Sequence, residues 1–283
     1  MKYAVSKTNT LDNRVKFARK GLILFFFILI FFSIVGYWLT HINAKWILFL
    51  MWTPGLASII VRLILREGLG DISLRLGGRS IIKVIPLVLL LPVTVGLIAY
   101  GIAWTTGLAQ FVAPETYLKA PPIVMFILFL LFNAIIGTIY GLIGSIGEEI
   151  GWRGYMLSRL VEAQVPYPLI LSGVIWGTWH IPLMIIGDYY SGPALAISIF
   201  LFMISAVAFG YVIGRLRLST GSIWPPIILH SAWNAVIQNA FGLFTQGDSA
   251  LLWTGESGIL VALTLLIVAF VYSRKSNVYI KST

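Results

Sequence analysis

Residues 121–147 read PPIVMFILFLLFNAIIGTIYGLIGSIG and contain no charged side chain. A helix needs about 20 mainly apolar residues to cross the hydrocarbon core of a bilayer. Lipid offers no hydrogen-bond partners to the backbone, and this stretch is too long and too uniformly apolar for a strand of a membrane barrel. The stretch therefore predicts a transmembrane helix.

The rest of the chain follows the same pattern. Of its 283 residues, 59% are hydrophobic and 11% are charged, and the mean hydropathy is +0.93, whereas a soluble domain of this length needs more polar surface. The predicted spans are 21–40, 46–66, 80–103, 121–147, 168–187, 194–214, 222–241 and 258–273. The predicted fold class is all-α, a polytopic membrane protein of about eight transmembrane helices.

A single helical membrane domain over 21–273 is the simplest domain organisation, with a basic segment at 1–20 before it and a tail at 274–283 after it. The run after the basic segment lacks a small-residue cleavage site, which favours a retained first span over a removed signal peptide. The chain has no cysteine, which excludes disulfides, thiolate catalysis and zinc bound by cysteine.

The distribution of positive charge predicts that both termini are cytoplasmic. With that orientation, every Lys and Arg except Lys45 and Lys119 lies at a cytoplasmic end, as the positive-inside rule requires. The net charge of +10 then needs no nucleic acid as a partner, because anionic membrane lipid explains it. We expect a multi-pass protein of the cell membrane.

The apolar stretch ends in the motif Gly-Glu-Glu-Ile-Gly-Trp-Arg, residues 147–153. On a helix, Glu149 and Arg153 share a face and can pair, while Glu148 points about 100° away. Arginine keeps one of two adjacent carboxylates ionised, whereas desolvation favours the neutral form of the other. The motif thus offers one structural carboxylate and one candidate general base, or alternatively a charged cap at the water interface.

Two of the three histidines lie inside apolar runs. His180 follows Trp176 by one helical turn, and His230 precedes Asn234 by one turn, so each pair shares a helix face. Either histidine could be a packing contact between helices. Ionisable residues within spans, however, usually mark function.

Packing alone gives no reason for six polar residues to gather in the fourth, fifth and seventh spans, in the cytoplasmic half or the middle of each. Small residues on a helix allow neighbouring helices to approach closely. We expect the glycines of the fourth span to bring Glu148 and Glu149 near the other two helices. These glycines are Gly137, Gly141, Gly144, Gly147, Gly151 and Gly154.

The ordered motifs Glu-Glu-x-x-x-Arg, aromatic-x-x-x-His and His-x-x-x-Asn, on separate spans within about 121–241, resemble those of the CPBP family. This family comprises the CAAX prenyl endopeptidases of the second type and their prokaryotic relatives in bacteriocin processing and immunity. Its second motif commonly begins with Phe, and Trp176 preserves an aromatic wall there.

The resemblance implies an intramembrane protease of the prokaryotic cell membrane. By position, Glu148 would activate water, and Glu149 and Arg153 would hold the local geometry. His180 would assist water activation, and His230 with Asn234 would stabilise the tetrahedral oxyanion. A carboxylate, an imidazole and directed donors in a dry site suit this chemistry. The expected substrates are peptides or membrane-anchored proteins, cut near the cytoplasmic face.

Zinc is possible, because the family is often described as metalloproteases and three ligands suffice for a hydrolytic site. Glu148, His180 and His230 would then be the ligands. Against zinc, the His-Glu-x-x-His signature is absent, the histidines lie 139 and 50 residues apart, and Asn234 suits an oxyanion donor better. We therefore favour no cofactor.

Two other functions remain open at this point. A non-catalytic immunity or peptide-binding protein could keep the same polar cluster. A proton-coupled transporter also uses chains of Glu and His, although its halves are expected to show internal symmetry, and no repeat is visible in this sequence.

Overall fold

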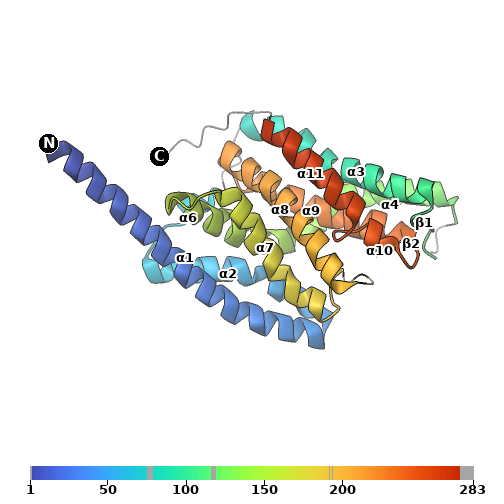
Figure 1. The fold of residues 1–283 in the computed structure, drawn as a ribbon, viewed down its shortest axis with the longest axis horizontal. Helices are drawn as coiled ribbons and strands as arrows, with labels where there is room; N and C mark the ends of the chain where they lie inside the picture. Colours follow the sequence, from blue (N-terminus) through green and yellow to red (C-terminus); the bar gives the residue numbers. More distant parts are fainter. Residues whose placement is uncertain (1, 75–78, 116–118, 191, 193, 275–283) are drawn as a thin grey trace.

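The computed structural model describes residues 2–74, 79–115, 119–190, 192 and 194–274, and it is built from helices apart from one pair of two-residue strands (Figure 1). Six helical segments of the described ranges are long and apolar enough to cross a membrane. They are Leu11–Ile42, Ala44–Leu65, Ile81–Thr106, Pro122–Glu162, Pro168–Ile185 and Leu195–Thr220. The all-α polytopic membrane fold is confirmed, and the orientation of its termini stays a prediction.

The predicted spans coincide with helices as follows. The first three spans are α1 (Lys2–Ile42), α2 (Ile47–Leu65) and α3 (Arg79–Thr106), with the 3₁₀ helices η1 (Ala44–Trp46) and η2 (Gly70–Ile72) between them. The fourth is a continuous series of α4 (Pro122–Phe132), η3 (Asn133–Gly137), α5 (Thr138–Gly151), η4 (Trp152–Met156) and α6 (Leu157–Glu162). The fifth and sixth are α7 (Pro168–Ile185) and α8 (Leu195–Thr220).

The last two predicted spans are the shortest. The seventh is α9 (Trp224–Trp233) continued by η5 (Asn234–Phe241), and the eighth is α11 (Ile259–Arg274). Between them lie η6 (Gly242–Phe244), β2 (Thr245–Gln246) and α10 (Ala250–Trp253). The strand β2 pairs antiparallel with β1 (Gln110–Phe111), Gln110 opposite Gln246, and so joins two connections at one end of the bundle.

The fourth helix differs from the sequence prediction. Residues 148–167 are expected to be a cytoplasmic connection, but the helix continues to Glu162 and leaves only 163–167 as the connection. The charged residues of the motif are buried within the bundle: Glu148 and Glu149 contact other helices, and Arg153 pairs with Glu149. Similarly, α1 extends through the polar segment before residue 21, where Asp12 and Lys16 form an exposed i, i+4 pair.

The helices pack around α5, α8 and α9. Helix α5 lies against α2 and α9, α7 against α8, and α11 against α8 and α3; Figure 1 shows α1 and α2 along one side of the bundle and α3, α4 and α11 along the other. One contiguous apolar core runs from Ala18 to Leu265. The domain boundaries given above stay a prediction.

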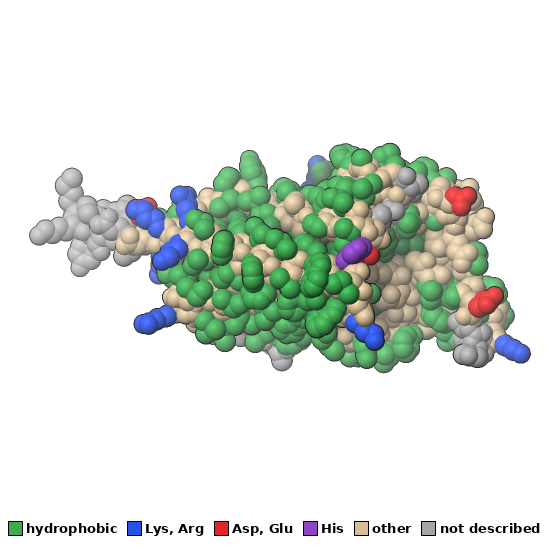
Figure 2. Space-filling model, turned by 90° about the horizontal axis from the view of Figure 1, so that it is seen from below, with side chains coloured by type: hydrophobic (Ala, Val, Ile, Leu, Met, Phe, Trp, Pro, Cys, Tyr) green, Lys and Arg blue, Asp and Glu red, His purple; other side chains and the backbone are tan. Residues whose placement is uncertain are grey.

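The two ends of the bundle carry different charge. The basic end comprises the connections 66–74, 163–167 and 221–223, and the acidic end comprises 43–46, 107–121, 186–194 and 242–258. The acidic end has Lys45 and Lys119 as its only basic residues in the sequence, against Glu115, Asp188, Asp248 and Glu256. Figure 2 shows Lys and Arg gathered mainly at the left end of the molecule, with apolar side chains over most of this face.

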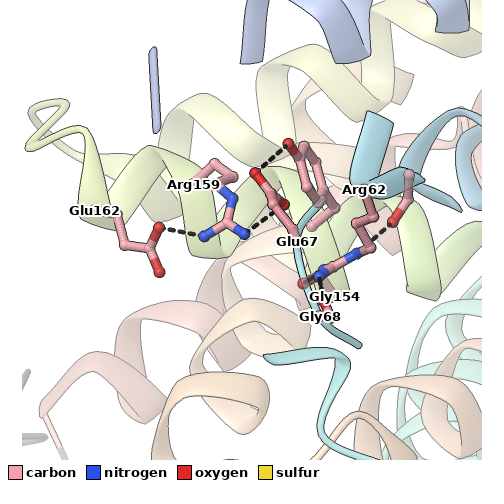
Figure 3. A network of polar contacts seen from close by, with 8 residues as sticks. Arg62, Glu67, Gly68, Gly154, Arg159 and Glu162 are labelled. Atoms are coloured by element: carbon pink, nitrogen blue, oxygen red, sulfur yellow. Dashed lines mark hydrogen bonds and ion pairs between the residues drawn. The ribbon is translucent and has the colours of Figure 1, made fainter. Parts of the chain in front are cut away.

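A buried ion network closes the basic end (Figure 3). Arg159 binds Glu67 at 2.7 Å and also pairs with Glu162. Arg62 donates to the carbonyl oxygens of Gly68 at 2.9 Å and Gly154 at 3.3 Å. The network therefore links the connection after α2 to η4, which is a π-helical turn, and to α6.

The glycines of the fourth helix pack on more than the predicted partners. A Cβ on Gly141 would meet Ser231 of α9 at 2.6 Å, as expected, but Gly144, Gly147 and Gly151 face α2 instead. A Cβ on Gly151 would lie 2.3 Å from Pro54. Helix α7 makes its own close approach to α8 through Gly173 and Gly177. Helix α2 is therefore a wall of the site that the sequence did not indicate.

Candidate active site

Two of the three motifs end within a π-helical turn. The turn η4 begins at Trp152, after the glutamates, and η5 begins at Asn234, after the histidine. Such turns are rare and often lie at functional sites. Because α9 remains regular up to Trp233, His230 and Asn234 keep the shared face that their spacing predicts.

Glu148 is buried and is held by an uncharged donor. Its side chain is 2% exposed, and its Oε2 accepts a hydrogen bond from Nε1 of Trp176 at 3.0 Å. No other hydrogen bond to Glu148 forms within the described ranges, so Oε1 is available to a ligand. Trp176 therefore does more than form an aromatic wall, because a Phe at this position has no group to donate.

Glu149 is the structural carboxylate that the spacing predicts. Its Oε1 binds Nη1 of Arg153 at 2.8 Å, and both side chains are fully buried. The same oxygen accepts from Nδ1 of His230 at 2.8 Å. Arg153 also lies over the Trp176 ring at 4.7 Å from its centroid, a cation–π contact. Glu149 thus connects two of the three motifs directly.

The position of the proton on each histidine follows from its partner. Nδ1 of His180 lies 2.9 Å from the carbonyl oxygen of Trp176, which only accepts, so Nδ1 carries the proton. In the neutral ring Nε2 is then the basic nitrogen. In the same way, the Glu149 carboxylate fixes the proton of His230 on Nδ1, and a carboxylate in this place orients an imidazole and supports its charged form.

The key polar residues line one cavity of about 200 Å³. Among the predicted residues it contains Glu148, His180, His230 and Asn234, whereas Glu149 and Arg153 lie behind the wall. The other lining residues are Ile47, Met51, Trp176, Trp179, Leu183, Asp188, Tyr189, Trp233, Gln238 and Glu256. Convergence of the three motifs is therefore a property of the fold.

The cavity lies toward the acidic end, whereas its residues are expected from the sequence in the cytoplasmic half or the middle of their helices; the side of the membrane that each end faces stays a prediction. Ile47 begins α2 at the acidic end, and Asp188, Tyr189 and Glu256 belong to connections there. No residue of the connections at the basic end lines it. The reason is that His180 is five residues from the end of α7, so its side chain lies nearer to the acidic end than the middle of a span.

Glu256 anchors the acidic end of the cavity. Its Oε1 accepts from Nε1 of Trp233 and from Nε2 of Gln238, each at 2.9 Å, and its Oε2 accepts from the hydroxyl of Tyr189. Burial, followed by the Glu256 charge, raises the pKa of Tyr189 well above its usual value, which keeps the hydroxyl as a donor. The Tyr189 ring lies 5.4 Å from that of His180. Glu256 therefore links three segments around the site.

Sequence reasoning missed this second group of residues. Gln238 follows Asn234 by four positions and donates to its Oδ1 at 3.4 Å, so helical spacing gave a signal for it. Tyr189 and Glu256 lie in connections between spans, where polar residues are ordinary. Nothing in the sequence distinguishes them from solvent-exposed positions.

The three candidate zinc ligands do not form a metal centre by their positions. In the part of the chain that the structure describes, no three His, Asp or Glu side chains are grouped closely enough to hold an ion. Nδ1 of His180 and of His230 bind oxygen atoms, which leaves Nε2 of each ring as the nitrogen open to a ligand. On the spacing of the candidate ligands the fit to zinc is poor, and the steps proposed below use the chain's own groups.

Comparison with known proteins agrees with the motif pattern. Residues 120–236 match the family described as type II CAAX prenyl endopeptidase, Rce1-like. A CAAX prenyl protease 2 from Methanococcus maripaludis is 31% identical over 133 residues, which is 44% of this chain and 47% of the relative. The similarity thus spans about half of that relative's length, and the residues that match the family include all three motifs.

Proposed function

We propose that this chain, which belongs to the family of type II CAAX prenyl endopeptidases through residues 120–236, hydrolyses peptide bonds within the membrane by means of an activated water. The family is one of membrane proteases, and the activity of this chain is the proposal. The observation that supports it most is the shared cavity of Glu148, His180, His230 and Asn234, in which Glu148 has a carboxylate oxygen available to water.

The proposed first step is general-base attack. Glu148 takes a proton from a water whose oxygen forms a bond to the carbonyl carbon of the substrate, and the carbonyl electron pair moves to its oxygen. His180 helps to hold this water through Nε2. A positioned base of this kind typically contributes about 10²–10⁴ to the rate.

The developing oxyanion needs donors on the other side of the cavity. His230 can donate from Nε2 when it is an imidazolium, which the Glu149 carboxylate on Nδ1 supports. The Oδ1 of Asn234 accepts from Gln238, which leaves the amide NH₂ to donate. The C–N bond then breaks, and the proton held by Glu148 passes to the leaving amine.

The test is cleavage of quenched fluorescent peptides, anchored to liposomes by an acyl chain, by the purified full-length protein. We expect Glu148→Gln to abolish cleavage and Asn234→Ala to leave weak activity, because loss of one oxyanion donor typically costs about 10²–10³ in rate. His180→Ala and His230→Ala should resemble Glu148→Gln. The matched control is Glu115→Gln, which changes an exposed residue outside the cavity and should cleave as the wild type does.

Wild-type levels of cleavage by Glu148→Gln would refute the proposed base. If the wild type cleaves none of the peptides but binds them, the non-catalytic peptide-binding or immunity function replaces the protease. Chelators are expected to inhibit only slightly. Complete inhibition that zinc reverses would instead assign a metal to Glu148, His180 and His230.

A further inference from the structure

The cavity is bounded differently at its two ends. Towards the basic end it stops at Glu148 and His230, below which the apolar core and the Arg159 network fill the bundle. Towards the acidic end it is bounded by Ile47, Asp188 and Glu256, which are loop or helix-end residues. A soluble or membrane-surface substrate therefore reaches the catalytic groups most directly from the acidic end.

The charge of the two ends predicts which side of the membrane each faces. Of the 20 Lys and Arg residues, only Lys45 and Lys119 belong to the acidic end. The positive-inside rule therefore places the basic end in the cytoplasm and the acidic end outside. The cavity therefore opens on the same side as the loops that are poor in Lys and Arg, which is the side predicted to be non-cytoplasmic.

We infer that the site is reached from the non-cytoplasmic face of the membrane, and that its substrate is an uncharged or positively charged peptide segment exposed on that face. This inference rests on the proposed function for the identity of the substrate, and on geometry and charge alone for the direction of access. It replaces the cytoplasmic-face cleavage predicted from the sequence.

The lining of the cavity supports the charge preference. Asp188 and Glu256 stand at its outer part, Asp188 with the exposed His41 ring at 3.4 Å, and none of the Lys and Arg residues that the structure describes lines the cavity. The three groups that bind Glu256 are uncharged donors, so they satisfy its oxygens and leave its negative charge uncompensated. A free C-terminal carboxylate would be repelled in this low-dielectric space, whereas an amine or a basic side chain would be attracted.

The absence of native cysteine allows single-cysteine labelling of the full chain in intact cells. Met51→Cys reports on the cavity, since Met51 lines it and has no proposed catalytic role. Ser249→Cys and Ser219→Cys are nearly isosteric controls at exposed positions of the acidic and basic ends. The probe is a membrane-impermeant maleimide, applied before and after permeabilisation.

We expect Met51→Cys and Ser249→Cys to be labelled on intact cells, and Ser219→Cys only after permeabilisation. The direction of access would be overturned if Met51→Cys, like Ser219→Cys, were labelled only after permeabilisation. It would also be overturned if Met51→Cys were not labelled at all. Ser249→Cys that reacts only after permeabilisation would overturn the orientation. Repeating the series with Glu148→Gln separates the two proposals, because labelling needs no catalysis.

The substrate class has its own test in proteoliposomes. Paired peptides that differ only in Lys or Glu beside the cleaved bond are added outside, and kcat/KM is compared. The Lys peptide should be cleaved faster, with a preference that falls when salt is raised and in Asp188→Asn. A preference for the Glu peptide would overturn the assigned class, and unchanged hydrolysis by Glu148→Gln would count against the proposed function alone.

Discussion

The basic end and the cavity both bury carboxylates, but they hold them in opposite ways. Glu67 at the basic end binds Arg159 at 2.7 Å, and Glu149 behind the cavity binds Arg153 at 2.8 Å. Glu148 and Glu256, which line the cavity, are held by indole, amide and phenol groups instead. Two of these buried glutamates are therefore paired with an arginine, and the other two are held by neutral donors.

The difference assigns different work to the two kinds of carboxylate. A buried ion pair needs well-matched geometry to compensate desolvation, and it is costly to break; Glu67 and Glu149 accordingly join helices. A carboxylate held by neutral donors is not paired with a cation. Glu148 keeps one oxygen available for chemistry, and Glu256, whose two oxygens both accept hydrogen bonds, can attract a cationic ligand. A cation bound to Glu148 would weaken it as a base; Arg153 binds Glu149 instead and contacts the Trp176 ring that donates to Glu148.

The largest expected effect on stability comes from Glu149→Gln. The change leaves Arg153 and His230 without their charged acceptor in a fully buried place, a loss of about 3–5 kcal/mol for a broken buried pair. Glu148→Gln should be milder, because its only partner in the described structure is an indole N–H. Thermal unfolding in detergent compares them, and greater destabilisation by Glu148→Gln would reverse the two assignments.

A smaller effect, on catalysis, is expected from Trp176→Phe. This change keeps the aromatic ring that the family commonly has but removes the donor to Glu148. Hydrogen bonds to charged groups contribute about 1.5–3 kcal/mol, so cleavage should fall by about ten- to a hundredfold. Wild-type activity would show that the indole N–H is dispensable for the placement of Glu148.

Glu256→Gln tests the carboxylate held by neutral donors at the acidic end. The amide NH₂ would face at least one donor among Trp233, Gln238 and Tyr189, and an unsatisfied buried group costs about 1–3 kcal/mol. We expect a lower unfolding temperature and a weaker preference for Lys peptides. The matched Glu115→Gln, at an exposed position, should alter neither measurement.

The smallest effect is expected outside both regions. Lys16 and Asp12 form a 2.9 Å pair with side chains 70% and 64% exposed, and such pairs contribute about 0–1 kcal/mol. Lys16→Ala should leave the unfolding temperature within error of the wild type. A large loss would mean that the polar part of α1 contributes to the packed bundle.

The sequence predicted what depends on long apolar runs and on helical spacing. The helices at the eight predicted positions, six of them long enough to span a membrane, follow from such local rules, as do the Glu149–Arg153 pair and the shared face of His230 and Asn234. The continuation of the fourth helix to Glu162 was missed because four residues between 148 and 159 are charged. Only tertiary contacts show that these charges are buried. Contacts between distant segments, such as Glu256 with Trp233, have no local signal.

The depth of the site was also beyond local rules. His180 lies five residues before the end of α7, but the direction in which the surrounding space opens depends on Asp188 and Tyr189 in the following connection. Asp188 contacts His41 of α1, and Tyr189 contacts Phe202 of α8 and Glu256 in the segment before α11. Charge asymmetry gave a testable orientation, yet only the cavity relates that orientation to the chemistry.

The π-helical turns limit how these helices can change length in evolution. Each of η4 and η5 lies at a polar motif: η4 separates Glu149 from Arg159, and η5 begins at Asn234 and contains Gln238. Loss of one residue within such a turn would restore α-helical spacing and rotate everything beyond it by about 100°. Insertions and deletions among homologues should therefore collect in the connections, and a one-residue gap aligned inside either turn would mark a relative in which the motif and the far end of its helix no longer face the same neighbours.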